Sequence, residues 1–182
     1  SGFLSAGAAT SAAKISEGAL PFDRRRHGLI LGMGAVGIVL EKEDALHKRG
    51  QYPIAKLLAS RCSNSAFHGT RLEIEHISHE MNKLIEKTTQ AVGINREELA
   101  KQSLFVSHET YTPAKGGSAS AEIQSLHHAF GEAARNILIT NTKGFTGHSM
   151  GAGIEDVIAI KALQWSKAPP IANLIKPDLE FQ

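Results

Sequence analysis

Apolar side chains recur with helical spacing between residues 72 and 92. They stand at positions 74, 77, 81, 84, 85 and 92, and mostly polar residues separate them. This spacing places them on one face of an α-helix, which is typical of a helix that covers a sheet. Gly93 follows at once and favours the end of the helix there, because glycine readily adopts the left-handed conformation of a C-terminal cap.

The rest of the chain after residue 52 alternates between two kinds of pattern. Short apolar runs predict strands, and longer amphipathic stretches predict helices. The expected strands are 52–59, 104–106 and 137–139, and the expected helices are 72–92, 96–101, 119–130 and 154–165. Strands that alternate with helices indicate a parallel sheet covered by helices, so we expect an α/β fold.

The part of the chain before residue 52 follows a different pattern. Residues 1–18 are rich in Ala, Ser and Gly and predict a closely packed helix. The nearly charge-free stretch 28–41 predicts strand segments that are covered on both faces and joined at 32–34. The glycines there suggest a bulge or the close approach of another backbone. This G-x-G lacks the strand-to-helix context of a dinucleotide site, so we reject that function. A short charged helix is expected at 42–49.

Composition and charge exclude several classes of protein. With 182 residues, 42% hydrophobic and 21% charged, the chain has the composition of one globular domain or a substantial piece of one. The net charge of +2 is small and dispersed, so we expect neither nucleic acid nor a membrane as a partner. We also expect no transmembrane helix and no secretory leader. The single cysteine fits a reducing, cytoplasmic compartment.

The histidines do not predict a metal site, although the chain has nine of them. His76 with His79, and His127 with His128, lie on polar faces of expected helices. No set of cysteine and histidine residues has the spacing of a zinc site. We therefore expect these histidines to be exposed to solvent and to bind no metal.

Reactive side chains are most concentrated in the segment 136–152. An apolar strand leads there into a glycine-rich loop with Lys143 and His148, and an apolar helix follows. His108 also follows a strand, so both histidines are expected at the edge of the sheet where open α/β folds place their chemistry. The N-terminus of the helix would favour an anion there. A glycine-rich turn that only serves close packing has the same pattern, so the pattern alone leaves both interpretations open.

Several motifs occur in the order found in β-ketoacyl synthases, the condensing enzymes of fatty acid and polyketide assembly. Residues 108–113 read H-E-T-Y-T-P and resemble the family's H-G-T-G-T-P, and residues 143–148 carry its K-x-x-x-G-H. The family's P-F-D-x-x-R-x-G stands at 21–28, its glycine-rich strand ending in L-E at 32–41, and its P-P-x-x-N at 169–173. The chain therefore resembles the later half of such an enzyme.

The resemblance implies a thiolase-like, layered αβαβα fold of which this chain is the later part. Residues 1–51 would be the tail of the first thiolase-like half, and residues 52–182 the second half without its last strands. The family's nucleophilic cysteine precedes the P-F-D segment, and no cysteine stands before residue 21. Cys62 lies on the wrong side of that segment, so we expect an ordinary half-buried thiol there. The nucleophile would belong to another part of the synthase.

The resemblance also implies a decarboxylative Claisen condensation between an acyl thioester and a malonyl-type extender on an acyl carrier protein. His108 and His148 would donate hydrogen bonds to the enolate oxygen, and Lys143 would hold His148 or influence its charge. Thr110 and Thr112 would bind the phosphopantetheine arm of the carrier, and the chain itself would bind no cofactor. The implied partners are acyl carrier protein, the nucleophile half of the synthase and a second copy in a homodimer.

Departures from the family motifs leave other interpretations open. Glu109 and Tyr111 replace glycines of the first histidine motif, and residues 114–121 form a longer link than usual to the helix that bears Glu122. A non-catalytic ketosynthase-like subunit or interaction module is therefore the alternative function. The K-x-x-x-G-H and H-x-T-x-T-P motifs argue against a thiolase-type or chalcone-synthase-type enzyme.

The isolated chain should have no condensing activity, because covalent catalysis cannot begin without the nucleophile. Apolar surface on 1–18 and 28–41 would be left uncovered, which favours self-association. We expect no product in a radiolabelled condensation assay and elution ahead of the monomer in size-exclusion chromatography. A monomeric chain that elongates an acyl thioester would contradict both expectations.

Overall fold

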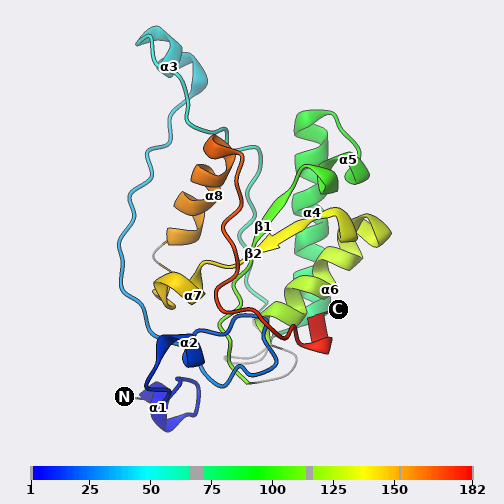
Figure 1. The fold of residues 1–182 in the computed structure, drawn as a ribbon. Coiled ribbons are helices and arrows are strands. Elements are labelled where there is room, and N and C mark those ends of the chain that lie inside the picture. Colours follow the sequence, from blue (N-terminus) through cyan, green and yellow to red (C-terminus); the bar gives the residue numbers. More distant parts are fainter. Residues whose placement is uncertain (1, 66–71, 114–116, 152, 182) are drawn as a thin grey trace.

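The fold is built around a short parallel sheet with helices on both sides (Figure 1). The computed structural model describes residues 2–65, 72–113, 117–151 and 153–181. Strand β1 (Leu104–Val106) pairs in parallel with β2 (Leu138–Thr140). The register is Leu104↔Leu138, Phe105↔Ile139 and Val106↔Thr140. The parallel pairing and the α/β class are confirmed, and β2 begins one residue later than the pattern predicts.

The helices after residue 72 form where their patterns predict. Helices α4 (Ile74–Val92), α5 (Arg96–Lys101) and α6 (Ser118–Phe130) lie on one side of the sheet, and α8 (Ile154–Trp165) lies on the other (Figure 1). A 3-10 helix, η1 (Gly131–Asn136), leads from α6 to β2. Gly93 ends α4 with a φ of 71°, as expected of a left-handed cap. None of the described helices is both long and apolar enough to cross a membrane.

The buried core lies between the sheet and the helices α4, α5 and α6. Ala100, Leu126, Ala129 and Phe130 form its centre. Partly buried side chains surround them, including those of Met81, Ile85, Leu99, Phe105, Ala133, Ala134, Ile137 and Ile139. Full burial of one large apolar side chain stabilises a fold by about 1.5–3 kcal/mol. The sheet is therefore fixed to these helices mainly by apolar packing.

The prediction of one helix over residues 1–18 is wrong. Only α1 (Gly2–Ser5) and α2 (Ile15–Gly18) are helical. Between them the backbone bonds to Leu29 instead: the Leu29 N–H donates to the Ala8 carbonyl (2.8 Å), and the Leu29 carbonyl accepts from the Thr10 N–H (2.9 Å). Backbone groups that bond to another segment are not available to a continuous helix, which explains the interruption.

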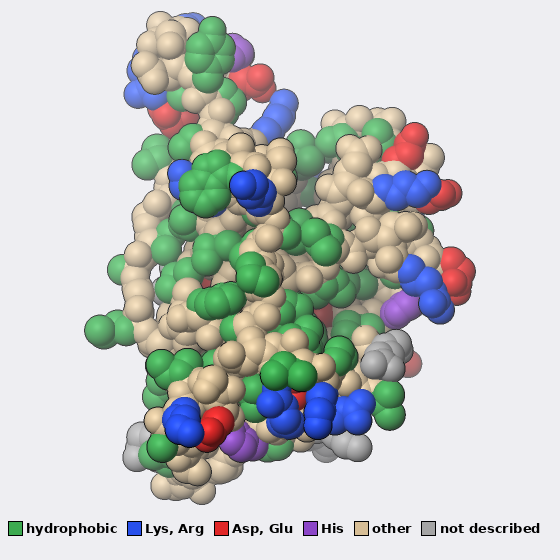
Figure 2. Space-filling view, in the orientation of Figure 1, with side chains coloured by type: hydrophobic (Ala, Val, Ile, Leu, Met, Phe, Trp, Pro, Cys, Tyr) green, Lys and Arg blue, Asp and Glu red, His purple; other side chains and the backbone are tan. Residues whose placement is uncertain are grey.

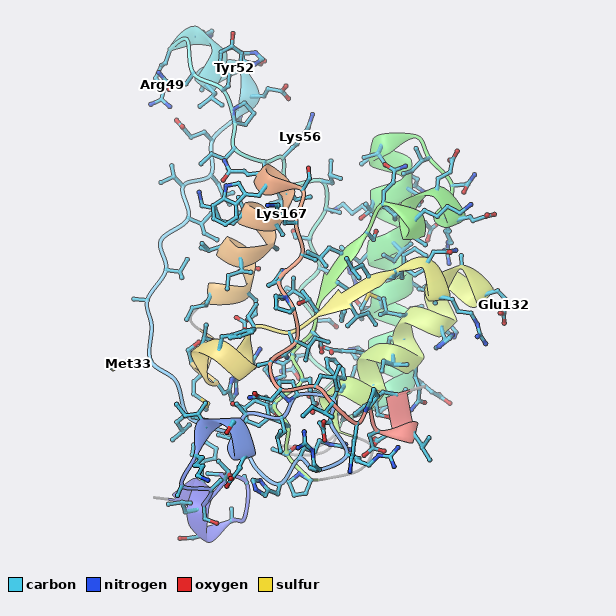
Figure 3. The ribbon with its side chains drawn as sticks, viewed as in Figure 1. Met33, Arg49, Tyr52, Lys56, Glu132 and Lys167 are labelled. Atoms are coloured by element: carbon cyan, nitrogen blue, oxygen red, sulfur yellow. The ribbon has the colours of Figure 1, made fainter. Side chains whose placement is uncertain are left out.

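The predicted strands at 28–41 and 52–59 are largely absent from the described structure. Leu29 and Leu31 form only isolated bridges, and residues 33–41 and 52–59 form no strand. They are also mostly exposed: Met33, 97% exposed, points away from the rest of the chain (Figure 3). A strand needs a partner for its N–H and C=O groups, and no described residue pairs with these segments. The expectation that both faces are covered is therefore wrong for this chain, whereas the expected uncovered apolar surface at 28–41 is confirmed.

A short helix, α3 (Glu43–Lys48), forms within the predicted range 42–49. It stands at the far end of the extended segment, away from the other helices (Figure 1). Arg49 and Tyr52 follow it, and the Tyr52 side chain is 86% exposed (Figure 3). None of the residues of α3 is buried. Within the described structure this helix therefore contributes nothing to the core.

Buried charges join the segment before residue 28 to the C-terminal residues. Asp23 is fully buried and accepts hydrogen bonds from the backbone N–H groups at 175–176 (2.9 and 2.8 Å). The guanidinium of Arg26 pairs with the carboxylates of Asp178 (2.5 Å) and Glu180 (2.8 Å). Glu180 lies in the 3-10 helix η2 (Leu179–Phe181). These bonds satisfy charges that would otherwise be costly to bury.

Two glycines meet where the segment after Gly28 crosses the loop before His148. A Cβ atom on Gly32 would lie 2.1 Å from the Thr146 carbonyl oxygen and 2.9 Å from the carbonyl carbon of Gly147. Gly147 itself has a φ of 67°, which favours glycine. The expected close approach of another backbone at 32–34 is thus confirmed.

The substitution Gly32→Ala should destabilise the chain by about 3 kcal/mol, because the added methyl group overlaps backbone atoms that cannot move independently. The free energy of unfolding in urea measures this change. Gly37→Ala is the matched control: a Cβ there meets nothing within 4 Å, and we expect a change within about 0.5 kcal/mol. Equal stability of the two variants would show that the two backbone segments do not approach each other closely at Gly32.

Candidate active site

The parallel sheet brings His108 and His148 together. His108 follows the carboxyl end of β1. His148 follows β2 after the short helix α7 (Lys143–Thr146). The two imidazole rings meet edge to face, with centroids 5.2 Å apart and an interplanar angle of 85°. The expectation that both histidines lie at one edge of the sheet is confirmed.

The His108 loop is held by a carboxylate of helix α6. Glu122 accepts hydrogen bonds from the His108 backbone N–H (2.8 Å) and from the Ser107 hydroxyl (2.5 Å). Burial raises the pKa of Glu122, and the hydrogen bond from Ser107 opposes that rise. The amide of Asn141 donates to the carbonyl groups of Ser107 (3.2 Å) and Glu109 (2.8 Å). The backbone on both sides of His108 is therefore fixed.

The backbone of His148 is joined to the segment after Gly28. Its N–H donates to the Ile30 carbonyl (2.8 Å), and its carbonyl accepts from the Gly32 N–H (3.0 Å). These two bonds form the isolated parallel bridge between Leu31 and His148. Among the described residues, the buried Nδ1 of His148 has no hydrogen-bond partner. The backbone is thus fixed, while this buried ring nitrogen is unpaired within the described structure.

Lys143 and Glu155 form a buried ion pair beside the histidines. The Lys143 side chain is 3% exposed, and its ammonium donates a hydrogen bond to the Glu155 carboxylate in the first turn of α8. Burial alone would raise the pKa of Glu155, but the hydrogen bond and charge of Lys143 hold that pKa below its ordinary value. The ammonium therefore bonds to Glu155, whereas it acts on the histidines through its charge.

Both imidazoles have a lowered pKa. Burial lowers the pKa of His148, and the positive charge of Lys143 lowers it further. His108 is more exposed, yet the protein around its ring removes enough water to lower its pKa, with additional contributions from Lys143 and His148. The negative charge of Glu155 opposes these effects. The site therefore favours two neutral imidazoles at neutral pH.

The two threonines predicted to bind the carrier arm differ in burial. Thr110 is buried, at 9% exposure, and Thr112 is half-buried with its carbonyl accepting a hydrogen bond from Arg26 (3.1 Å). Both stand in the loop that begins with His108, but their role remains a prediction. A surface hollow between α4 and α6, lined in part by His79 and His128, lies away from the paired histidines. In the described part of the chain, no group of three or more His, Cys, Asp or Glu residues could hold a metal ion.

Residues 55–175 match the C-terminal domain of β-ketoacyl synthases. The chain belongs to the β-ketoacyl synthase family. A related 3-oxoacyl-[acyl-carrier-protein] synthase 2 from Coxiella burnetii is 31% identical over 160 residues, which cover 87% of this chain and 37% of that protein. The protein of the same name from Staphylococcus aureus strain COL is 27% identical over 181 residues, covering 98% and 42%. This β-ketoacyl synthase chain thus spans about two fifths of the length of these relatives.

Solved structures agree with this family and with a partial fold. The ishigamide ketosynthase/chain length factor has a TM-score of 0.81 at 26% identity, with 98% of this chain and 40% of that one covered. A β-ketoacyl synthase from Burkholderia phymatum STM815 has a TM-score of 0.80 at 22% identity, with 99% and 42% covered. The fold is therefore the thiolase-like fold of ketosynthases, of which this chain forms one part.

Two residues outside the family motifs also contribute to the site of this synthase chain. Glu155 and Asn141 were not predicted from the sequence. An acidic residue in the first turn of the helix after the glycine-rich loop was an available signal for Glu155, since carboxylates favour helix N-termini. Asn141 lies between a predicted strand and Lys143, and nothing in the local pattern indicates that its amide bonds to the other histidine loop. Cys62, expected to be half-buried, is exposed.

Replacement of Lys143 by Met should raise the pKa of both His108 and His148. The positive charge disfavours the imidazolium form, so its removal favours protonation, and the unpaired charge of Glu155 acts in the same direction. The pH titration of the ring Hε1 protons by NMR measures both values. Lys161→Met removes an exposed lysine of α8 and should leave both titrations unchanged. A titration of either site histidine that is the same with and without Lys143 would contradict this electrostatic role.

Proposed function

We propose that this chain forms the histidine-bearing part of a β-ketoacyl synthase that performs decarboxylative Claisen condensation. The substrates are an acyl thioester and a malonyl-type extender carried by acyl carrier protein. The observation that carries this proposal is the pairing of His108 and His148 with ring centroids 5.2 Å apart. The names of the relatives, 3-oxoacyl-[acyl-carrier-protein] synthase 2, support the same reaction.

The histidines act on the charge that develops during decarboxylation. When the bond between C2 of the extender and its carboxylate breaks, carbon dioxide leaves and the electron pair forms an enolate. The N–H groups of His108 and His148 donate hydrogen bonds to the enolate oxygen and stabilise its negative charge. A neutral imidazole has one N–H donor, and the lowered pKa of each ring keeps it neutral. Lys143 contributes through its charge.

Carbon–carbon bond formation follows from the enolate. Its carbon attacks the carbonyl carbon of the acyl thioester, the new C–C bond forms, and the C–S bond breaks with release of the thiolate. The thioester is carried by a nucleophilic cysteine in a part of the synthase outside this chain. Cys62 is not this nucleophile, because its place relative to the P-F-D segment is wrong.

The carrier protein delivers the extender through its phosphopantetheine arm. Thr110 and Thr112 bind this arm through their hydroxyl groups, since both lie within a few residues of His108. A structural relative at 23% identity is titled as a type II polyketide synthase acyl carrier protein in complex with its ketosynthase, which supports the same kind of partner. We also propose a homodimer and a cytoplasmic location, where the single cysteine stays reduced.

A non-catalytic ketosynthase-like subunit is the second candidate function. Glu109 and Tyr111 stand where the motif has glycines, and one structural relative carries "chain length factor" in its title. The retained pair of histidines and the buried Lys143–Glu155 pair favour catalysis, because both would be unnecessary for a purely structural subunit. The decarboxylation assay below separates the two functions.

In the complete synthase, His108→Ala or His148→Ala should abolish release of carbon dioxide from the extender. Each donor is worth roughly 10²–10³ in rate, because it stabilises charge that appears only in the transition state. Acyl loading on the nucleophile should continue, since it does not require the enolate. Labelled carbon dioxide and labelled acyl-enzyme measure the two steps separately.

The control variants for this experiment are His127→Ala and Cys62→Ala. His127 is exposed near the end of α6, and Cys62 is exposed in the segment before α4. Both variants should load the acyl group and release carbon dioxide at the wild-type rate. Wild-type decarboxylation by either site variant would refute the proposed role of the histidines, and loss of loading in Cys62→Ala would refute the assignment of the nucleophile elsewhere.

A further inference from the structure

Tyr111 occupies a position of the first histidine motif where β-ketoacyl synthases have glycine. Tyr111 is fully buried, and its φ of 46° lies in the left-handed region that residues other than glycine rarely adopt. Its backbone N–H donates to Oε1 of the buried Glu109 (3.0 Å), and its carbonyl accepts from the Gly28 N–H (3.1 Å). A large side chain is thus held in a conformation that suits glycine, so its contacts require an explanation.

The Tyr111 hydroxyl bonds to two backbone groups from different segments. It accepts a hydrogen bond from the Ile30 N–H (3.2 Å) and donates one to the Lys143 carbonyl (3.2 Å). A phenolic hydroxyl can act as donor and acceptor at the same time. Neither glycine nor phenylalanine at this position could connect these two groups.

Both of these groups lead directly to His148. The Ile30 carbonyl accepts the His148 N–H (2.8 Å), and the Lys143 carbonyl also accepts the Gly147 N–H (2.9 Å). The hydroxyl therefore bonds to the backbone of Ile30 and of Lys143. The carbonyl groups of these same two residues accept the N–H groups of His148 and Gly147. Tyr111 itself belongs to the loop that begins with His108. One buried side chain thus connects the loops of both histidines.

We propose that Tyr111 is a positioning residue that holds the His148 loop at a fixed distance from the His108 loop. It touches no substrate and acts through the backbone at Ile30 and Lys143. The geometric part of this proposal stands by itself, whereas its consequence for catalysis rests on the proposed function.

The hydroxyl proton of Tyr111 in the unmodified chain gives the first test. Because it is buried and hydrogen-bonded, it should exchange slowly with solvent, be visible by NMR, and show a nuclear Overhauser effect to the Ile30 amide proton. The Tyr52→Phe variant assigns it, because the chain contains only two tyrosines and Tyr52 is exposed. Rapid exchange of the Tyr111 hydroxyl, or no contact with Ile30, would overturn the proposal without any variant at Tyr111.

Tyr111→Phe gives the second test, because it removes the hydroxyl and keeps the ring. We expect hydrogen exchange at the Gly147 and His148 amides to rise about tenfold, since their acceptor segments lose a buried partner. Exchange at the Ser107 amide, which bonds to the Thr140 carbonyl of β2, should stay within about twofold. The matched variant Tyr52→Phe should change none of these rates. An equal rise at all three amides, or no rise at His148, would refute a local positioning role.

Decarboxylation by the complete synthase tests the catalytic consequence. Tyr111→Phe should lower kcat about tenfold and leave KM for the extender unchanged, because the donors are displaced while substrate binding is kept. A raised KM with unchanged kcat would refute the positioning of His148 for catalysis. If the unmodified synthase releases no carbon dioxide, the proposed function fails, whereas the exchange measurements still decide whether Tyr111 joins the loops.

Discussion

The parallel pairing of β1 with β2 is the interaction on which the rest of the site depends. Parallel strands end at the same edge of a sheet, so whatever follows Val106 and Thr140 must lie side by side. The ladder continues one step further, where the Ser107 N–H donates to the Thr140 carbonyl (2.9 Å). His108 comes next along the first strand, and the turn of α7 leads from the second strand to His148. The separation of the two imidazoles is therefore largely a consequence of strand register.

Burial and the charge of Lys143 together lower the pKa of the paired rings. Lys143 is almost fully buried, and such a charge is tolerated because Glu155 accepts its hydrogen bond. The pair is close to neutral overall, but Lys143 affects the histidines more strongly than Glu155 does, and its charge adds to the lowering of the pKa that burial causes. The protonated imidazolium cannot accept a proton or a hydrogen bond, whereas the neutral ring has one donor and one acceptor nitrogen. The ion pair thus acts on the paired histidines through its charge.

The sequence predicts the regular elements of the second part of the chain well. Helix α4 has a long amphipathic pattern and a capping glycine, and its bounds differ from the expectation only at the start. The bounds of β1, the bounds of β2 to within one residue, and the place of both histidines were predicted from local patterns as well. The bonds of Asn141 and Glu155 were not, because each joins segments that lie far apart in the sequence or carry no pattern of their own. Side-chain bonds of this kind depend on tertiary structure rather than on periodicity.

The failed strand predictions have a different physical cause. Apolar composition at 28–41 and 52–59 indicates a segment that must be covered, but it does not identify what covers it. In this chain the side chains of Met33, Val39 and Tyr52 remain more than four fifths exposed. Hydrophobic side chains also spread over the face that contains α8, where Leu163 and Trp165 are each 66% exposed (Figure 2). The chain spans about two fifths of the length of its relatives. The pattern therefore describes the apolar composition of these segments correctly, although this chain does not bury them.

The Tyr111 position shows how a departure from a family motif can be compatible with the fold. A side chain in the left-handed region costs on the order of 1–3 kcal/mol. Each hydrogen bond of the buried hydroxyl contributes about 0.5–1.5 kcal/mol, and burial of the aromatic ring adds to that. These contributions are of the same size as the conformational cost or larger, so they offset that cost and the tyrosine is compatible with the fold. The same bonds connect Ile30 and Lys143, and through them the loop of His148. Stability at this position therefore depends on the arrangement that the paired histidines require.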